Sequence, residues 1–358
     1  MMQLNYKTIK FKKKTFKAAV LVALNKPLKI INLQFPEKLF EGQVLVKLKR
    51  AAICGAQINE IRGVKGPDKY IPHMMGHEGY GEVILTGPNV RRVKAKNKVV
   101  MHWRKADGID ANNAEYNSNI GTVNSGKITT FSEYSIVSEN RLTKIDFDKN
   151  FNKIEPLFGC CIPTAYGVVK NEAKVKKKDK VLIFGAGGLG LSISVVAKYF
   201  GVKNITFVDK KFINQKKFFI KKLNFSNSSF VDVKNIKQLI SSKIRFNQIF
   251  ETTGDVKNIS NCFDLLDKNS NLILIGQPKN NKLYLKKPLK FFSNIKIFAS
   301  DGGQVKPDKD LFKILNIIKG NPNKYFNYMI SHEFKISQIN YGINLLKKNK
   351  ALRVIINF

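Results

Sequence analysis

Val181-Leu182-Ile183-Phe184-Gly185-Ala186-Gly187-Gly188-Leu189-Gly190 is the stretch that decides the fold. An apolar strand here enters a G-x-G-x-x-G turn, and a helix is expected over about 189–200. Gly185 permits the tight turn, Gly187 lets the backbone approach a pyrophosphate, and Gly190 lets the helix pack closely on the strand. Gly188 and Leu189 lie in the same turn at the helix N-terminus, whose dipole favours anionic phosphates. The stretch therefore predicts a dinucleotide-binding site.

Asp209 closes the next expected strand and is the residue expected to select the cofactor. Its carboxylate would accept hydrogen bonds from the adenosine ribose 2′-OH and repel a 2′-phosphate, which favours NAD over NADP. Lys210 and Lys211 follow directly, and two cations partly offset that repulsion. NADP therefore stays the less favoured alternative.

The pattern of the chain changes near residue 160 of its 358 residues, a length that suits two domains. Before this point come short β-type runs at 18–23, 43–52, 79–85, 98–102 and 131–137. From Val181 onward, strands expected at 205–208, 229–233, 248–251, 272–275 and 295–299 alternate with helices at 212–223, 236–242 and 256–266. This alternation predicts an α/β fold with a doubly wound parallel sheet. A last apolar strand, 353–358, can return to the first module.

Composition excludes some classes of protein. No apolar run reaches the ~18 residues of a membrane span, the N-terminus lacks a signal-peptide core, and four irregularly spaced cysteines do not suggest a disulfide framework. We expect a cytoplasmic protein. The net charge of +37 fits a nucleic-acid partner. However, the lysines are spread along the whole chain, which indicates a general compositional drift and no specific nucleic-acid surface.

Cys54, His77 and Cys160 form a second constellation, in the β-rich half. Two thiolates and one imidazole suit a catalytic zinc ion, because three protein ligands leave a fourth tetrahedral position open. Each residue alone also has a structural interpretation, and the spacings match no short zinc-binding pattern. The residues by themselves leave the two interpretations about even.

The chain resembles the medium-chain, zinc-dependent alcohol dehydrogenases over nearly its full length. The resemblance rests on motifs in family order: Lys17-Ala18-Ala19-Val20, Gly42 to Val46, Ile53-Cys54-Gly55, Gly76 to Gly81, Thr130 to Tyr134, Gly159-Cys160, Tyr166-Gly167 and Gly185 to Gly190. It implies a GroES-like β-barrel catalytic domain, 1–163 and 300–358, and a Rossmann NAD-binding domain, 164–299. The active site would lie in the cleft between them.

The resemblance also implies roles for single residues. Cys54, His77 and Cys160 would be the zinc ligands, with Glu78 as a neighbouring carboxylate or transient ligand. Arg353 matches the arginine that reaches the pyrophosphate. Gly276 falls where the family backbone contacts the nicotinamide, and Trp103 where a bulky residue lines the substrate pocket.

Two departures from the family pattern change these expectations. No cysteine lies between Trp103 and Phe131, where many members carry four for a structural zinc, so one catalytic zinc per subunit is expected. Ala56 stands where the family commonly has a Ser or Thr proton relay, and Gln57 replaces the usual Asp. No relay residue is assigned, although His102, next to Trp103, is a candidate for the substrate pocket.

The leading hypothesis is a zinc- and NAD-dependent dehydrogenase of a small secondary alcohol, polyol or sugar-type substrate, or the matching carbonyl reductase. A homodimer or homotetramer is expected, with no membrane and no specific nucleic acid as partner. Two alternatives stay open: a zinc-free quinone or enoyl reductase of the same superfamily, and a nucleic-acid-associated protein on an enzyme fold.

Overall fold

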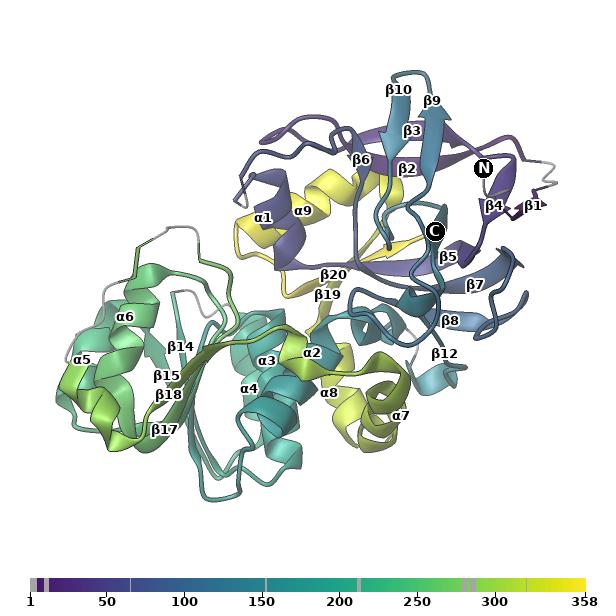
Figure 1. Cartoon of the computed structure of the whole chain (residues 1–358). Helices are drawn as coiled ribbons and strands as arrows, with labels where there is room; N and C mark the ends of the chain where they lie inside the picture. Colours follow the sequence, from purple (N-terminus) through teal and green to yellow (C-terminus); the bar gives the residue numbers. More distant parts are fainter. Residues whose placement is uncertain are drawn as a thin grey trace. The chain divides into compact units, whose positions relative to one another are not determined.

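The structure is a computed structural model that describes residues 5–9, 13–64, 66–151, 153–210, 214–278, 282–283, 288–319 and 321–358. The chain divides into two compact units (Figure 1). Unit 1 comprises Met1–Cys160, Lys306–Phe312 and Ile330–Phe358, and unit 2 comprises Cys161–Val305 and Lys313–Met329. Each unit is described in turn.

Unit 1 is built on the long strand β5 (Gln43–Ile53), which pairs with three antiparallel neighbours. These are β7 (Glu78–Thr86), β11 (Tyr134–Ser138) and β20 (Arg353–Asn357). The sheet has the order β12-β8-β7-β5-β20-β19, and its outer strands are β8 (Lys98–His102), β12 (Leu142–Lys144) and β19 (Ile330–Lys335). Strand β20 therefore completes a sheet begun some 300 residues earlier in the chain.

A second sheet of unit 1 has the order β3-β2-β6-β10-β9. Its strands are β2 (Thr15–Leu21), β3 (Lys29–Gln34), β6 (His73–Met74), β9 (Glu115–Ser118) and β10 (Gly121–Asn124), and β1 (Tyr6–Thr8) pairs separately with β4 (Lys38–Phe40). Strand β5 shows why the unit folds this way. Val44 and Val46 enter one buried cluster while Leu45 enters another, as the two-residue period of a strand requires.

Unit 2 contains a six-stranded sheet of order β15-β14-β13-β16-β17-β18 in which every pair is parallel. The strands are β13 (Lys180–Phe184), β14 (Asn204–Asp209), β15 (Asn227–Asp232), β16 (Phe246–Glu251), β17 (Leu266–Leu274) and β18 (Lys296–Ala299). Helices α3 (Gly188–Tyr199) and α4 (Asn214–Leu223) cover one face, and α5 (Ile236–Ser241) and α6 (Val256–Leu265) the other (Figure 1). This is the doubly wound order that binds dinucleotides at the carboxyl ends of its strands.

The structure confirms the predicted fold class, including the return of the last strand to the first module. It differs at the C-terminal part, where the prediction assigned all of 300–358 to the catalytic domain. Residues 300–305 and Lys313–Met329 belong to unit 2, and within the second stretch α8 (Asn321–Met329) packs against α3 and α4. Strands β9, β10 and β19 are among the strands that were not predicted. Their sequences are short and polar, so periodicity gives little signal.

The described helices are short: α3 and α7 (Pro307–Ile318), with 12 residues each, are as long as any of them. No described helix combines the length and the hydropathy that a membrane span needs.

Candidate metal and nucleotide sites

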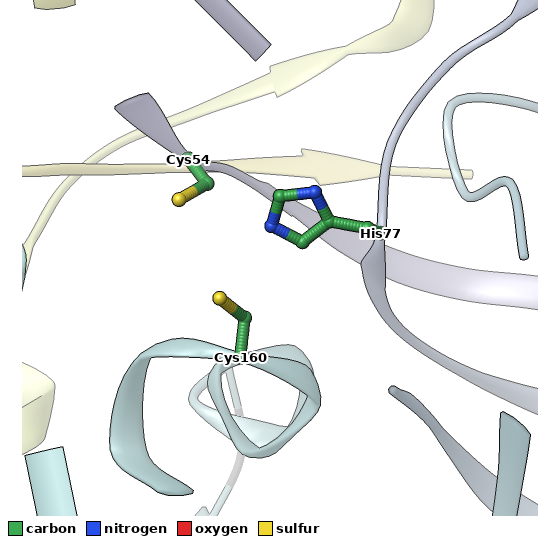
Figure 2. A group of neighbouring side chains, drawn as sticks. All are labelled: Cys54, His77 and Cys160. Carbon is green, nitrogen blue, oxygen red and sulfur yellow. The ribbon is translucent and has the colours of Figure 1, made fainter. Parts of the chain in front are cut away.

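Three segments of unit 1 bring Cys54, His77 and Cys160 together (Figure 2). Cys54 follows β5 and precedes helix α1 (Gly55–Ile61), and His77 immediately precedes β7. Cys160 follows the 3₁₀-helix η3 (Glu155–Gly159), which packs on β7 and β8. Their two sulfur atoms and one ring nitrogen lie within 4.8 Å of one another. The sequence prediction that these three residues converge is therefore supported by the geometry.

Pairing between β5 and β7 explains how residues 54 and 77 meet, because Ala51 pairs with Gly79 near the end of both strands. Cys160 depends on a close approach of η3 to the sheet. A Cβ atom on Gly159 would lie 2.3 Å from the Met101 carbonyl oxygen of β8, so only glycine allows this contact.

Gln57 orients the imidazole of His77. Its Oε1 accepts a hydrogen bond from the Cys54 N–H at 2.9 Å, and its Nε2 contacts Nδ1 of His77. The Nε2 atom of His77 consequently faces the two sulfur atoms (Figure 2). This nitrogen is buried and has no hydrogen-bond partner among the described residues. A buried ring nitrogen beside two thiols has the geometry and the chemistry of a zinc donor.

The charges around the three residues favour a cation. The pKa of the Cys54 thiol lies well below its usual value, chiefly because Cys160 can hydrogen-bond to the thiolate, with further help from His77 and Arg353 and against the effect of burial. Burial lowers the pKa of His77, but the neighbouring Cys54 sulfur and the Glu78 and Glu60 carboxylates outweigh it, so the net shift is upward. The site therefore holds negative charge at the position where a divalent ion would bind.

Glu78 lies next to this group but is not one of its converging donors. It is fully buried and ion-paired through Oε1 with Nη2 of Arg353, on strand β20, which is separated from β7 by β5. Burial, opposed by the Arg353 guanidinium, raises the pKa of Glu78 to about 7. Glu78 was predicted as a possible zinc ligand and Arg353 as a pyrophosphate contact. The structure thus places two residues with separate predicted roles in one ion pair. Both roles stay predictions.

Ala56 and Trp103, predicted for the substrate pocket, border the same group. Ala56 is half-buried in the first turn of α1, two residues after Cys54. The Trp103 N–H donates to the Gly159 carbonyl oxygen at 3.3 Å, which places its backbone beside Cys160.

His102 was expected in the substrate pocket, but the structure buries it and gives both of its ring nitrogens protein partners. It is 1% exposed; Nδ1 is hydrogen-bonded to the Arg104 carbonyl oxygen at 2.8 Å and Nε2 to the Thr143 hydroxyl at 2.9 Å. Burial lowers its pKa to about 4. Both ring nitrogens already have protein partners, so the structure gives His102 a packing role between β8 and β12.

In unit 2, the glycine turn has the shape that the sequence predicts for a phosphate cradle. Gly185 has a φ of +95°, and a Cβ on Gly190 would lie 1.9 Å from the Gly185 carbonyl oxygen. A Cβ on Gly187, in contrast, would meet no described atom within 4 Å. Gly188 and Leu189 form the first turn of α3. The protein therefore leaves room at Gly187 and at the helix N-terminus, where a pyrophosphate would fit.

Gly276 lies beyond the end of β17, where its N–H donates to the Glu251 carbonyl oxygen at 3.0 Å. A Cβ there would lie 2.2 Å from the Gly254 backbone nitrogen. Gly276 thus permits a close contact between two turns at the carboxyl ends of β16 and β17. Its predicted contact with a nicotinamide stays a prediction.

Asp209 ends β14, and its Oδ2 accepts a hydrogen bond from the Ala186 N–H of the glycine turn at 2.8 Å. The same oxygen forms an ion pair with Nζ of Lys216 at 2.8 Å. Lys211, which was expected to moderate the charge of Asp209, lies outside the described residues, and Lys210 is exposed.

Sequence reasoning gave no role to Gln57 or to Lys216. The signal for Gln57 was its position three residues after Cys54, where a side chain can reach back to the N-cap. Lys216 shares the spacing of the apolar stripe of α4, whose buried residues are 216, 219, 220 and 223. A lysine on the apolar face of a helix indicates a buried partner.

Comparison with known proteins relates this chain to alcohol dehydrogenases. Residues 41–147 match the family model of the alcohol dehydrogenase GroES-like domain. The chain is 27% identical to alcohol dehydrogenase class-3 of Cereibacter sphaeroides, over 96% of this chain and 99% of that protein. The fold is similar to benzyl alcohol dehydrogenase from Acinetobacter calcoaceticus, with a TM-score of 0.81, 20% identity, and 97% and 100% of the two chains covered.

The chain therefore contains an alcohol dehydrogenase GroES-like domain and is similar to alcohol dehydrogenases over nearly its full length. A further member of this fold is a short chain alcohol dehydrogenase from Escherichia coli CFT073, whose structure was solved with NADH. Its TM-score to this chain is 0.76 at 20% identity, over 97% of this chain and all of that one. The cluster of Cys54, His77 and Cys160 could hold a metal ion, and two thiolates with one imidazole are a donor set used for catalytic zinc.

Proposed function

We propose that this protein is a zinc-dependent dehydrogenase that interconverts a small secondary alcohol, polyol or sugar-type substrate and its carbonyl form with NAD(H). The convergence of Cys54, His77 and Cys160 carries this proposal. Two thiolates and one imidazole leave one position of a tetrahedral ion open for a substrate oxygen, which distinguishes a catalytic zinc site from a structural one. The same set of donors argues against the zinc-free reductase alternative.

Each part of the site has a defined task. A zinc ion bound to these donors would lower the pKa of an alcohol hydroxyl toward neutrality and polarise a carbonyl. Gln57 keeps the His77 ring turned so that Nε2 faces the sulfurs. The backbone of Trp103 borders the site beside Gly159, and its indole would supply apolar surface that excludes water. The glycine turn and Asp209 of unit 2 would hold the diphosphate and the adenosine ribose.

The number of zinc ions and the assembly state belong to this proposal. The region between Trp103 and Phe131 contains no cysteine and folds in part as the hairpin β9-β10, which supports one zinc per chain and no structural zinc. A homodimer or homotetramer and a cytoplasmic location are proposed from the family resemblance and the low cysteine content.

Metal analysis of the purified protein, by plasma mass spectrometry, tests the proposal. We expect about one zinc per chain in the wild type and less than a tenth of that in Cys54→Ala and Cys160→Ala. Cys161→Ala is the matched control, because this neighbouring thiol contacts Ser192 in unit 2 and should leave the zinc content unchanged. Two zinc ions per chain would overturn the stoichiometry.

A screen of NAD reduction over alcohols, polyols and nucleotide sugars tests the activity and identifies the substrate. Zinc-loaded wild type should reduce NAD with at least one substrate class, and Cys54→Ala with none. Equal turnover in the wild type and in zinc-free Cys54→Ala would refute a metal-dependent reaction.

A further inference from the structure

We propose that the amino edge of the parallel sheet in unit 2, the side at which its strands begin, binds the phosphates of a single-stranded nucleic acid without sequence preference. Six exposed lysines define this surface, here called the basic edge: Lys177, Lys178, Lys180, Lys203, Lys268 and Lys296. The inference is independent of the proposed function, because the glycine turn and Asp209 lie at the opposite, carboxyl edge of the same sheet.

The register of the sheet gathers lysines that lie far apart in the sequence. Every strand pair is parallel, so all six strands begin on the same side. Lys180 begins β13 and pairs with Asn204 of β14, the residue directly after Lys203. Lys268 is among the first residues of β17, and Lys296 begins β18. Since neighbouring strands lie about 4.8 Å apart, the row of cations from β14 to β18 is about 19 Å long.

The lysine-rich loop before β13 is fixed at this edge. Asp179 is 3% exposed, and its carboxylate accepts hydrogen bonds from the Lys176 N–H at 2.8 Å and from Nδ2 of Asn247 at 2.7 Å. A Cβ on Gly201 would lie 2.8 Å from Cγ of Lys177, so the stem of this lysine packs on the turn between α3 and β14. These contacts hold the loop beside the start of β14.

Little negative charge compensates the basic edge. None of its six lysines has a carboxylate oxygen within 4.0 Å among the described residues. Asp267 is exposed nearby, but its Oδ1 accepts from the backbone N–H of Lys268 at 2.8 Å. Asp209, Asp232 and Glu251, in contrast, end their strands at the carboxyl edge. A row of unpaired cations attracts a polyanion, and the counterions released from its phosphates drive binding.

The dimensions of the basic edge suit a nucleic-acid strand. At about 3.4 Å per nucleotide along one strand, a row of about 19 Å spans about five or six phosphates. Tyr199, at the end of α3 beside the same turn, is 51% exposed and offers a ring on which a base can stack. Membrane binding is usually strengthened by a contiguous apolar face, which a single ring does not provide.

Fluorescence anisotropy with a labelled oligothymidine of about 20 nucleotides, at about 50 to 200 mM salt, tests the surface. The triple variant Lys178→Gln, Lys180→Gln, Lys203→Gln should raise Kd tenfold or more at about 100 mM salt and reduce the slope of log K against log salt by about two. The control triple Lys26→Gln, Lys94→Gln, Lys144→Gln removes the same charge from exposed positions of unit 1 and should change Kd by less than about threefold.

Thermal unfolding and NADH binding, both unchanged, should show that each triple variant is folded. Equal losses of oligothymidine affinity in the two triples would overturn the inference, because net charge alone would then explain binding. The same holds if the edge triple weakened binding to phosphatidylserine vesicles but not to oligothymidine, since the partner would then be a membrane. Loss of NADH binding in the wild type would count against the proposed function and leave this inference intact.

Discussion

Among single residues, Gln57 orients His77, one of the three proposed zinc ligands, although Gln57 is not itself proposed as a ligand. The Gln57 amide is neutral, whereas the aspartate that is common at this position in the family carries a negative charge. Its contact with His77 Nδ1 therefore fixes the ring without adding a negative charge to the site. Residues that orient a metal-ligating histidine contribute substantially to metal affinity.

Gln57→Leu keeps most of the side-chain volume and removes both polar contacts. We expect zinc affinity to fall by about 10–100-fold, because the ring is then free to turn and the Cys54 N–H loses its acceptor. Competition with a chromophoric chelator measures this. Gln57→Glu, which retains an acceptor for that N–H, should recover part of the loss. Equal affinity in Gln57→Leu and the wild type would show that packing alone orients His77.

His102 predicts how stability depends on pH. Its folded-state pKa of about 4 lies below the unfolded value of about 6.5, so the unfolded chain binds more protons between these values. The contribution of neutral His102 is therefore complete above pH 6.5 and is lost as pH falls toward 4. The full loss is about 3 kcal/mol in the free energy of unfolding.

Urea denaturation of the wild type and His102→Gln at pH 7 and pH 5 measures this contribution. The variant keeps a donor and an acceptor but does not titrate, so its stability should decrease less between the two pH values. Its turnover rate at pH 7 should also stay within a few-fold of wild type. If turnover instead fell by about two orders of magnitude while stability stayed normal, the proton-relay role would be supported.

At the scale of elements, the turn between β13 and α3 contains two glycines with different tasks. Folding requires one of them, and ligand binding is proposed to require the other. A Cβ on Gly190 would collide with the Gly185 carbonyl oxygen, whereas a Cβ on Gly187 would enter open space among the described atoms. Gly190 allows α3 to pack closely on β13. Gly187 leaves the space in which we propose that a pyrophosphate binds.

Two alanine substitutions test this separation. Gly190→Ala should lower the free energy of unfolding by about 1–3 kcal/mol or more, because backbone atoms must move apart. Gly187→Ala should change it by less than about 0.5 kcal/mol but weaken NADH binding tenfold or more. Thermal unfolding and nicotinamide fluorescence measure the two effects. A stable Gly190→Ala protein with normal NADH binding would contradict the packing argument.

The same element shows what a sequence can predict. The glycine spacing and the alternation of strands and helices after it are local patterns, and the structure has them where expected. The convergence of residues 54, 77 and 160 depended on family resemblance, since their spacing follows from sheet pairing that local patterns do not encode. The partners of His102 and Lys216 were not predictable, because a single sequence does not show which side chains burial brings together.

For the whole molecule, the net charge of +37 predicts polyanion binding without sequence preference. Such binding depends on counterion release, so affinity for duplex DNA should fall steeply between about 50 and 200 mM salt. Fluorescence anisotropy with two unrelated oligonucleotides measures this, and both should give the same dissociation constant. A preference above tenfold at near-physiological salt would instead favour the nucleic-acid alternative.

Strand β20 has a consequence for how the enzyme matures in the cell. It pairs with β5, which leads to Cys54, and carries Arg353, the ion-pair partner of Glu78, yet it is translated after all of unit 2. While the ribosome is still synthesising unit 2, the nascent chain already exposes all three donors but lacks a strand that supports them. We therefore expect a stable metal site to form only after β20 has been translated, and a chain truncated before Arg353 to bind the proposed zinc ion more weakly.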